Sequence, residues 1–154
     1  MERKKIKRMI IAIALIGTFF IFGTETKKAQ AAYIDDAAFN AIVSGFYQGS
    51  GEYSAAVSYY YNDWEYCYDE YVAFDAARVA AYNSALYASY SSANYAYDAY
   101  VAALDAYAYL DSATNYAYDA WYYQSYDSYA LSLYYGGLAA QSLAYAQYYA
   151  AYLY

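Results

Sequence analysis

Between Tyr33 and Tyr154 the sequence contains no lysine, no histidine and no proline. The absence of histidine excludes the common zinc sites and the Ser–His or Cys–His nucleophiles from this stretch. The absence of lysine excludes Schiff-base catalysis, and no glycine-rich phosphate-binding loop followed by Lys-Ser or Lys-Thr is present. We therefore expect a protein that is not an enzyme and that has neither a metal site nor a cofactor.

Basic residues are concentrated at the N-terminus, where five of the first eight residues are Lys or Arg. An apolar run covers residues 9–23, and the small-x-small sequence Ala29-Gln30-Ala31 follows. This order is typical of a secretory signal peptide, and the run is short for a membrane-spanning helix, which needs about 20 residues. We predict a signal peptide at residues 1–31 and a secreted or cell-surface protein. Membrane attachment is expected only if this segment is not cleaved.

The remaining residues, 32–154, are strongly acidic, with thirteen carboxylates against the one guanidinium of Arg78, a formal net charge of −12. Because phosphate contacts need Lys and Arg, we expect no nucleic-acid partner. The length suits one domain with a single core. The only cysteine, Cys67, cannot form an intrachain disulfide; we predict that it is buried, and the alternative is a free thiol that pairs between chains.

Alanine and tyrosine dominate this domain, with 30 residues of each. Alanine is the best helix former, and runs of period-two alternation are too short for strands. We predict helices at 36–46, 52–90 and 138–153, separated from the rest by glycines. The predicted breaks lie at Gly45, Gly49 and Gly51, and at Gly136-Gly137. The predicted inward faces carry Phe39, Ile42, Val43 and Phe46 in the first helix, and Val57, Tyr60, Trp64, Tyr68, Tyr71, Val79 and Tyr82 in the second.

A stripe of mostly small residues recurs at alternating intervals of four and three. It comprises Ala85, Ser89, Ser92, Ala96, Ala99, Ala103, Ala106, Leu110, Ala113, Ala117, Ala120 and Gln124. A sustained 3.5-residue period is typical of packed, gently supercoiled helices. Small residues let two backbones approach closely, and the flanking aromatic rings would cover the joint. The alternative is that an alanine-rich composition produces such a stripe by chance. The flanking rings are Tyr100, Tyr107 and Trp121 on one side and Tyr95, Tyr109, Tyr116 and Tyr123 on the other.

The sequence SSANYAYDAY at Ser91 recurs as SATNYAYDAW at Ser112, three heptads later. Either each serine begins a separate helix, or one helix continues through the second copy. We favour a break near Ser91 and a continuous helix through Ser112. The predicted fold is all-α, a bundle of four or five helices of unequal length with an alanine-rich heptad seam.

Tyrosine supplies the remaining chemistry, as an uncharged donor and acceptor with an aromatic face. Thirty rings exceed what a core of this size needs, and exposed aromatic patches usually contact a partner. We predict a structural or adhesive protein that self-associates or contacts cell-surface or matrix material such as polysaccharide. The predicted contact residues are Tyr97, Tyr118, Tyr122 and Tyr126.

Two other functions stay open. Tyrosine and aspartate oxygens suit ferric iron, and tyrosine can ligate haem iron, so a module that binds iron or haem is the first alternative. The second is an enzyme with paired carboxylates, such as Glu65 and Asp69 one helical turn apart, acting on a sugar. Paired acids of this kind are more often solvated helix faces.

Overall fold

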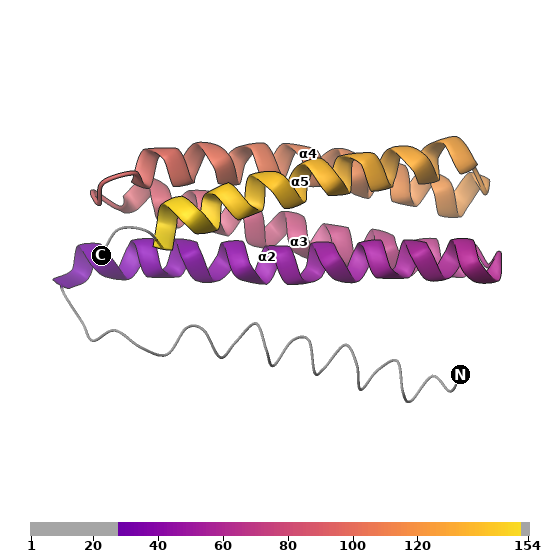
Figure 1. Ribbon diagram of the computed structural model, residues 1–154, viewed down its shortest axis with the longest axis horizontal. Helices are drawn as coiled ribbons and strands as arrows, with labels where there is room; N and C mark the ends of the chain where they lie inside the picture. Colours follow the sequence, from indigo (N-terminus) through magenta and orange to yellow (C-terminus); the bar gives the residue numbers. More distant parts are fainter. Residues whose placement is uncertain (1–27, 152–154) are drawn as a thin grey trace, which may run out of the picture.

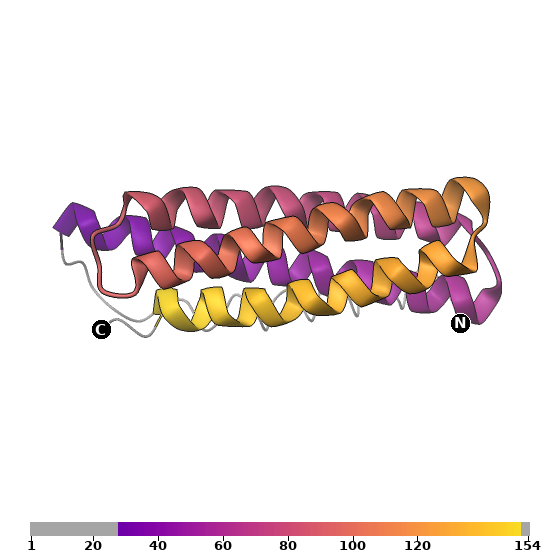
Figure 2. The ribbon, with the colours of Figure 1, turned by 90° about the horizontal axis from the view of Figure 1, so that it is seen from above.

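The computed structural model describes residues 28–151, with side chains for 32–151, and this part of the chain is entirely helical apart from three short connections. Consecutive helices run antiparallel, and each packs against two neighbours, so that the four form an elongated bundle (Figures 1 and 2). The predicted all-α bundle is confirmed, with four helices in the described residues. They are α2 (Lys28–Tyr61), α3 (Glu65–Tyr90), α4 (Ala96–Tyr123) and α5 (Tyr126–Ala151).

The predicted signal peptide at residues 1–31 lies outside the described residues, except that the backbone of 28–31 begins α2. Cleavage after Ala31 and secretion therefore stay predictions. Among the helices of residues 28–151, none combines the length and the apolar character needed to cross a membrane.

The predicted break at Gly45, Gly49 and Gly51 is wrong, because α2 continues through all three glycines. Packing explains the glycine at position 51. A Cβ atom there would lie 2.5 Å from Cε1 of Phe74, and a Cβ atom on Gly136 in α5 would lie 2.9 Å from Cζ of the same ring. These two glycines make room for the largest fully buried side chain of the bundle. Burial of the ring offsets the roughly 0.5–1 kcal/mol that glycine costs inside a helix.

The predicted break at Gly136-Gly137 is also wrong, since α5 runs through this pair. The chain turns earlier, at Gln124, whose φ of 52° lies in the left-handed region. The Ser125 hydroxyl then accepts a hydrogen bond from the Ser128 N–H at 3.2 Å, which is the geometry of a helix N-cap. The last helix therefore begins at Tyr126 rather than at residue 138.

The predicted second helix, 52–90, is divided between α2 and α3. Its interruption follows Tyr61, where Asn62 adopts a φ of 50°. Asparagine enters this left-handed conformation more readily than most residues, because its short polar side chain forms local hydrogen bonds. The helix resumes at Glu65, whose N–H donates to the Asp63 carboxylate at 3.2 Å.

The predicted break near Ser91 is confirmed, and so is the single helix through Ser112. Ser91 ends α3, and its hydroxyl accepts a hydrogen bond from the Ala93 N–H at 3.1 Å. Tyr95, with a φ of 57°, precedes the first residue of α4. The repeated sequence thus has two local structures: its first copy begins in a loop and its second lies inside a helix.

Alanines line the inner face of α4, and none of those in the seam is more than 4% exposed. They are Ala96, Ala99, Ala103, Ala106, Ala113, Ala117 and Ala120, with Leu110 between them. The predicted stripe is wrong at its ends. Ser89 and Ser92 are exposed because they precede α4, and Gln124 is exposed because it follows α4. Ala85 is buried, but it belongs to α3.

The other helices bury residues at the same alternating intervals of three and four. In α2 they are Ile34, Ala37, Ala41, Ser44, Gln48, Gly51, Ala55 and Ser58. In α3 they include Cys67, Glu70, Phe74, Ala77, Ala81, Ser84 and Ala88, and in α5 Ser132, Gly136, Ala139, Leu143, Ala146 and Ala150. A shared 3.5-residue period keeps one face of every helix turned to the bundle axis. The whole bundle, and not α4 alone, is built on seams of small residues.

The predicted inward faces of the first two helices are wrong. The side chains of Phe39, Tyr60, Tyr68, Val79 and Tyr82 are exposed, and the other bulky members of these faces are only half-buried. The cause is steric, because a large ring in the seam would hold the backbones apart. Small residues therefore occupy the seam, and the large side chains lie beside it or outside it.

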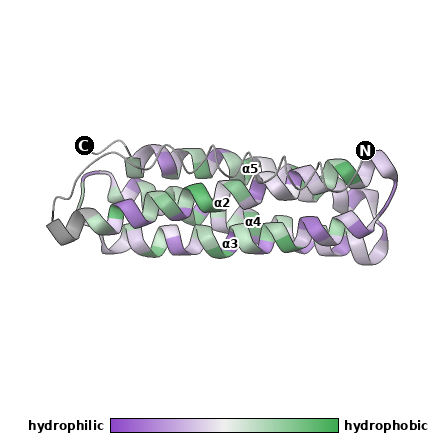
Figure 3. Cartoon of the chain, turned by 90° about the horizontal axis from the view of Figure 1, so that it is seen from below, coloured by the Kyte–Doolittle hydropathy of each residue, from purple (hydrophilic) through white to green (hydrophobic). Residues whose placement is uncertain are grey.

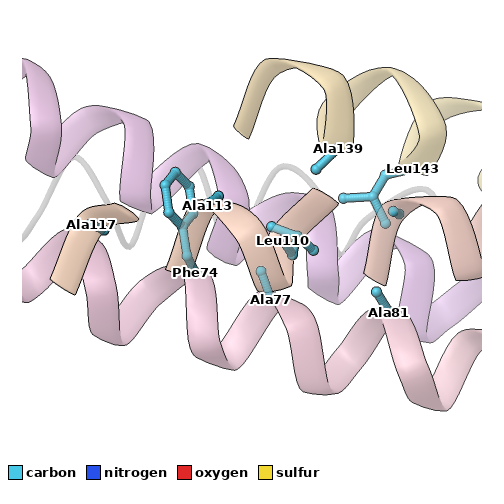
Figure 4. Close-up of a cluster of buried hydrophobic side chains, with 9 residues drawn as sticks. Phe74, Ala77, Ala81, Leu110, Ala113, Ala117, Ala139 and Leu143 are labelled. Carbon is cyan, nitrogen blue, oxygen red and sulfur yellow. The ribbon is translucent and has the colours of Figure 1, made fainter. Parts of the chain in front are cut away.

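Few large side chains fill the centre of the bundle. Phe74 points from α3 into a cluster in which Leu110 of α4 and Leu143 of α5 also meet (Figure 4). Ile34 fills a second cluster nearer the start of α2. These four are the largest fully buried side chains, and apart from Cys67 the other buried hydrophobic residues are alanines, each of which buries little area.

Buried serines connect α2 and α3 in a reciprocal pair. The Ser44 hydroxyl donates to the Ala77 carbonyl oxygen at 2.7 Å, and the Ser84 hydroxyl donates to the Ala37 carbonyl oxygen at 2.8 Å. A hydroxyl as short as that of serine reaches a backbone carbonyl of the neighbouring helix only when the two helices lie very close. The pair thus satisfies two buried polar groups and marks the closeness of the joint.

Candidate interaction surface

Six aromatic side chains gather over the joint between α3 and α4, towards the C-terminal end of α4. We call them the α3–α4 aromatic patch: Tyr68, Tyr71, Tyr118, Trp121, Tyr122 and Tyr123. Positions 118, 121 and 122 share one face of α4, because residues three and four apart on a helix are neighbours. Tyr68 and Tyr71 meet them from the adjacent face of α3.

The rings of this patch contact one another in a continuous network. Tyr118 stacks on Tyr122 with ring centroids 5.9 Å apart and an interplanar angle of 8°. Trp121 lies 5.7 Å from Tyr118 and 5.0 Å from Tyr68, and Tyr71 lies 5.6 Å from Tyr118. Such pairs contribute about 0.5–1.5 kcal/mol each beyond their buried area. The network therefore holds the rings in place in the unbound protein.

Much of the patch faces water. Tyr118, Tyr122 and Tyr123 are 40%, 62% and 69% exposed, whereas Trp121 is half-buried among its neighbours. Hydropathy colouring shows no broad apolar face in Figure 3, where green and purple residues are interspersed along the helices. Tyrosine combines an aromatic face with a polar hydroxyl, so a surface of this kind is aromatic without being strongly hydrophobic.

Within residues 32–151, no basic side chain lies among the rings of the patch. The one basic side chain of residues 32–151, Arg78, pairs with Asp75 at 2.6 Å and with Asp111 at 3.0 Å. Its guanidinium also lies 6.0 Å from the ring centroid of Tyr107. Since both partners are carboxylates of the same bundle, Arg78 is not available to neutralise the acidity of another region.

The four tyrosines predicted from the sequence as contact residues do not form one site. Tyr118 and Tyr122 stack together in the patch. Tyr126 is exposed at the same end of the bundle, where it contacts Trp64 at 4.9 Å and donates to Asn62 Oδ1 at 3.0 Å. Tyr97, also exposed, lies near the opposite end, at the start of α4.

A small pocket lies beside Tyr126, between the end of α2 and the start of α5. Its lining includes Ser58, Tyr59, Trp64, Tyr126 and Tyr129, and its volume is about 10 Å³. A single water molecule needs roughly this much space. The pocket is therefore too small for an organic ligand.

The paired acids considered for catalysis are on the surface. Glu65 and Asp69 are both exposed in the first turns of α3, as are Asp35 and Asp36 in α2. Among the described residues, no group of three or more Cys, Asp or Glu side chains is arranged to hold a metal ion.

A buried carboxyl group was not foreseen from the sequence. Glu70 is fully buried in α3, where one carboxyl oxygen, Oε1, accepts a hydrogen bond from the Ser132 hydroxyl of α5 at 2.7 Å. The other oxygen, Oε2, has no hydrogen-bond partner among the described residues. The pKa of Glu70 is raised to about 8, mainly by desolvation. The Ser132 hydrogen bond lowers this pKa, and nearby Glu52 raises it further. At neutral pH this side chain is therefore mostly a neutral carboxylic acid.

The prediction that Cys67 is buried is confirmed, as its side chain is inaccessible to solvent. Its sulfur lies 3.2 Å from the Ser58 hydroxyl. Burial raises the pKa of the Cys67 thiol. The hydrogen bond to Ser58 lowers this pKa by a smaller amount, and the nearby Glu70 raises it. A buried thiol with a raised pKa is a poor nucleophile.

Tyr68 and Tyr71 are the patch residues that sequence reasoning placed elsewhere, in the core. The signal that could have moved them is the spacing of small residues in α3, where Ala77, Ala81 and Ala88 repeat the seven-residue period of α4. That period assigns the inner face to small residues, which turns Tyr68 and Tyr71 towards the rim of the joint. The pairing of the two helices follows from the fold and has no sequence signal of its own.

Comparisons of this chain with protein-family models, with curated proteins and with solved structures found no match.

Proposed function

We propose that this is a secreted structural or adhesive protein that associates with further copies of itself through the α3–α4 aromatic patch. The observation that carries the proposal is the exposed stack of Tyr118 on Tyr122 beside Trp121. Tyrosine and tryptophan are enriched at the energetic centres of protein interfaces, because they bury a large area with few rotatable bonds. Here the neighbouring rings already restrict the rotamers, which lowers the entropic cost of binding further.

A second copy of the chain is a natural partner for this surface. In a two-fold arrangement each patch would meet the same patch, so aromatic rings would contact aromatic rings without requiring a charge of either sign. With about half of six rings exposed, at 150–250 Å² per ring, the patch offers roughly 500 Å². A standard interface uses about 800 Å² per partner. We therefore expect association that is weak and reversible.

Electrostatics oppose this association, and the opposition has a measurable signature. Two copies with a formal net charge of −12 each over residues 32–154 repel one another. The Debye length falls from about 30 Å at 0.01 M salt to about 8 Å at 0.15 M, so salt screens this repulsion. Aromatic association through the patch should therefore strengthen as salt is added, whereas contacts between opposite charges would weaken.

Light scattering and sedimentation across protein concentration test the proposal, at low salt and near 0.15 M NaCl. We expect the mass to rise with concentration and with salt. The double variant Y118S/Y122S should reduce association, because it removes the stacked pair. The control is Y90S/Y134S, which removes two rings of similar exposure, 58% and 60%, from other parts of α3 and α5.

Two results would contradict self-association through the patch. One is a protein that stays monomeric at every concentration and salt. The other is an equal loss of association in the Y90S/Y134S control, because tyrosine exposure in general would then be responsible. If the monomer instead binds a soluble neutral polysaccharide, and Y118S/Y122S abolishes that binding, the patch is an adhesive surface for sugars.

A further inference from the structure

A second surface feature lies at the other end of α4, away from the aromatic patch. It is an open groove of about 380 Å³ between the N-terminal half of α4 and the C-terminal half of α5. Sites for small ligands usually have volumes of 300–1,000 Å³, so this groove is large enough for a small organic molecule. We call it the α4–α5 groove. Its principal lining residues are Tyr97, Asp98 and Asp105 from α4, and Ser142, Tyr145 and Tyr149 from α5.

Aromatic rings form one wall of this groove. Tyr145 and Tyr149, one turn apart in α5, are stacked with centroids 6.3 Å apart at 23°. Tyr95, which does not line the groove, stacks on Tyr149 at the same distance and angle and supports this ring from outside. The two lining rings of α5 give the groove an aromatic side. Tyr97 lines the α4 side and is strongly exposed.

Two carboxylates make the groove negatively charged. Asp98 and Asp105 are exposed on α4 and seven residues apart, and therefore about 10 Å apart along the helix axis. None of the lining residues is basic. The one basic side chain of residues 32–151, Arg78, already pairs with Asp75 and Asp111. The bundle thus supplies no cation of its own to the groove.

Between the two carboxylates the surface is apolar. Val101 and Ala102 line the groove one turn after Asp98 and one turn before Asp105. An alkyl chain can lie on these side chains and against the tyrosine rings, with an ammonium group at each aspartate.

We propose that the α4–α5 groove binds a linear aliphatic polyamine, with ammonium groups at Asp98 and Asp105 and the chain between them against Val101, Tyr145 and Tyr149. The charge complementarity selects a cation, and the spacing of the carboxylates selects an elongated one with at least two charges. A neutral sugar would leave both carboxylates without an ionic partner, and a compact monocation would engage only one of them.

Isothermal titration with spermidine tests the proposal on the full chain at low salt. We expect saturable binding with one spermidine per chain. D98N and D105N should each weaken binding by about fivefold, which corresponds to the loss of about 1 kcal/mol from an ionic contact near 4 Å in water. Circular dichroism on each variant checks that the bundle remains folded.

The matched control is D119N. Asp119 lies in α4, a multiple of seven residues from Asp98 and Asp105, but outside the groove. Its substitution removes the same charge and should leave spermidine binding within about twofold. Equal weakening by D119N would overturn the proposal, because spermidine would then be a diffuse counterion of an acidic protein.

Shorter and less charged ligands give a further comparison. Propanediamine, whose charges are too close together to reach both aspartates, and octylamine, which has one charge, should each bind at least about fivefold more weakly than spermidine. Octanediol, which is neutral, should not bind. The proposal is refuted if octylamine or octanediol binds as tightly as spermidine, or if spermidine gives no saturable heat.

Discussion

Replacing Glu70 with glutamine removes the one fully buried ionisable carboxyl group among the described residues and leaves the side-chain shape nearly unchanged. The pKa of Glu70 is about 8 in the folded protein, compared with 4.5 for an ordinary glutamate. Because the folded-state pKa is raised, the folded protein retains a proton that the unfolded chain has already lost at neutral pH. Below about pH 4.5 Glu70 does not lower the free energy of unfolding through ionisation. Between about pH 4.5 and pH 8 the free energy of unfolding falls as pH rises, because the unfolded chain loses the proton first.

The free energy of unfolding changes by about 1.36 kcal/mol for each pH unit above the unfolded-state pKa, up to the folded-state pKa. The difference in the free energy of unfolding between E70Q and wild type should be pH-independent below about pH 4. It should then shift in favour of E70Q by about 3 kcal/mol at pH 7 and by about 5 kcal/mol at pH 9. Glutamine retains an acceptor oxygen for Ser132, and its amide replaces the unpaired O–H of the neutral acid with two N–H donors. The additional donor gives a constant offset of about 1–3 kcal/mol against the variant.

Urea unfolding followed by circular dichroism at intervals between pH 4 and pH 9 measures this difference. The E65Q variant is the control, because it removes an exposed carboxylate from the same helix. If the E70Q curve is parallel to the wild-type curve, Glu70 ionises normally in the folded state, which would contradict its burial.

Three further predictions concern the interior of the bundle. Gly51→Ala should destabilise the protein by about 1–3 kcal/mol, because its methyl group would meet Phe74, whereas Gly49→Ala, where nothing lies within 4 Å, should stabilise it by up to about 1 kcal/mol. Chemical denaturation compares the two, and equal effects would contradict the packing argument. Ser44→Ala should cost about 1 kcal/mol through the lost interhelical hydrogen bond; no change in the unfolding midpoint would count against it. Cys67 should react with an aromatic disulfide reagent only after unfolding, and rapid labelling of the native protein would refute its burial.

The fold class and the seam of α4 could be predicted from the sequence, because both depend on short-range periodicity. A small residue every three or four positions specifies which face of a helix is buried, whatever packs against it. The break near Ser91 was predicted from a different signal, a serine that can cap a helix, because the stripe of small residues itself continues through Ser89 and Ser92.

The continuation of α2 and α5 through Gly51 and Gly136 could not be predicted, because it depends on a residue from another helix. Gly51 and Gly136 have the local character of helix breakers, and only the position of the Phe74 ring explains why they lie inside helices. The left-handed conformation at Gln124 carries no comparable sequence signal. Here tertiary packing overrides local propensity.

The predicted inward faces of the first two helices were wrong for a related reason. Assigning the largest apolar side chains to the core is sound when helices are about 10 Å apart, but seams of alanine and serine bring the backbones closer. Tyr68 and Tyr82 then have no room in the seam. The aromatic patch and the α4–α5 groove depend on which helices become neighbours, which the periodicity of a single helix does not reveal.

The contact of Phe74 with Gly51 and Gly136 also bears on how the helices align along the bundle axis. A seam of alanines at every third or fourth position looks nearly the same after a shift of seven residues, or about 10 Å. Such a seam specifies which faces meet but discriminates poorly between alternative alignments. A bulky ring that fits only against two glycines distinguishes one alignment from the others, because in a shifted alignment the ring would meet larger side chains. The Phe74 ring thus gives the bundle a unique register, beyond the stability it adds by burial.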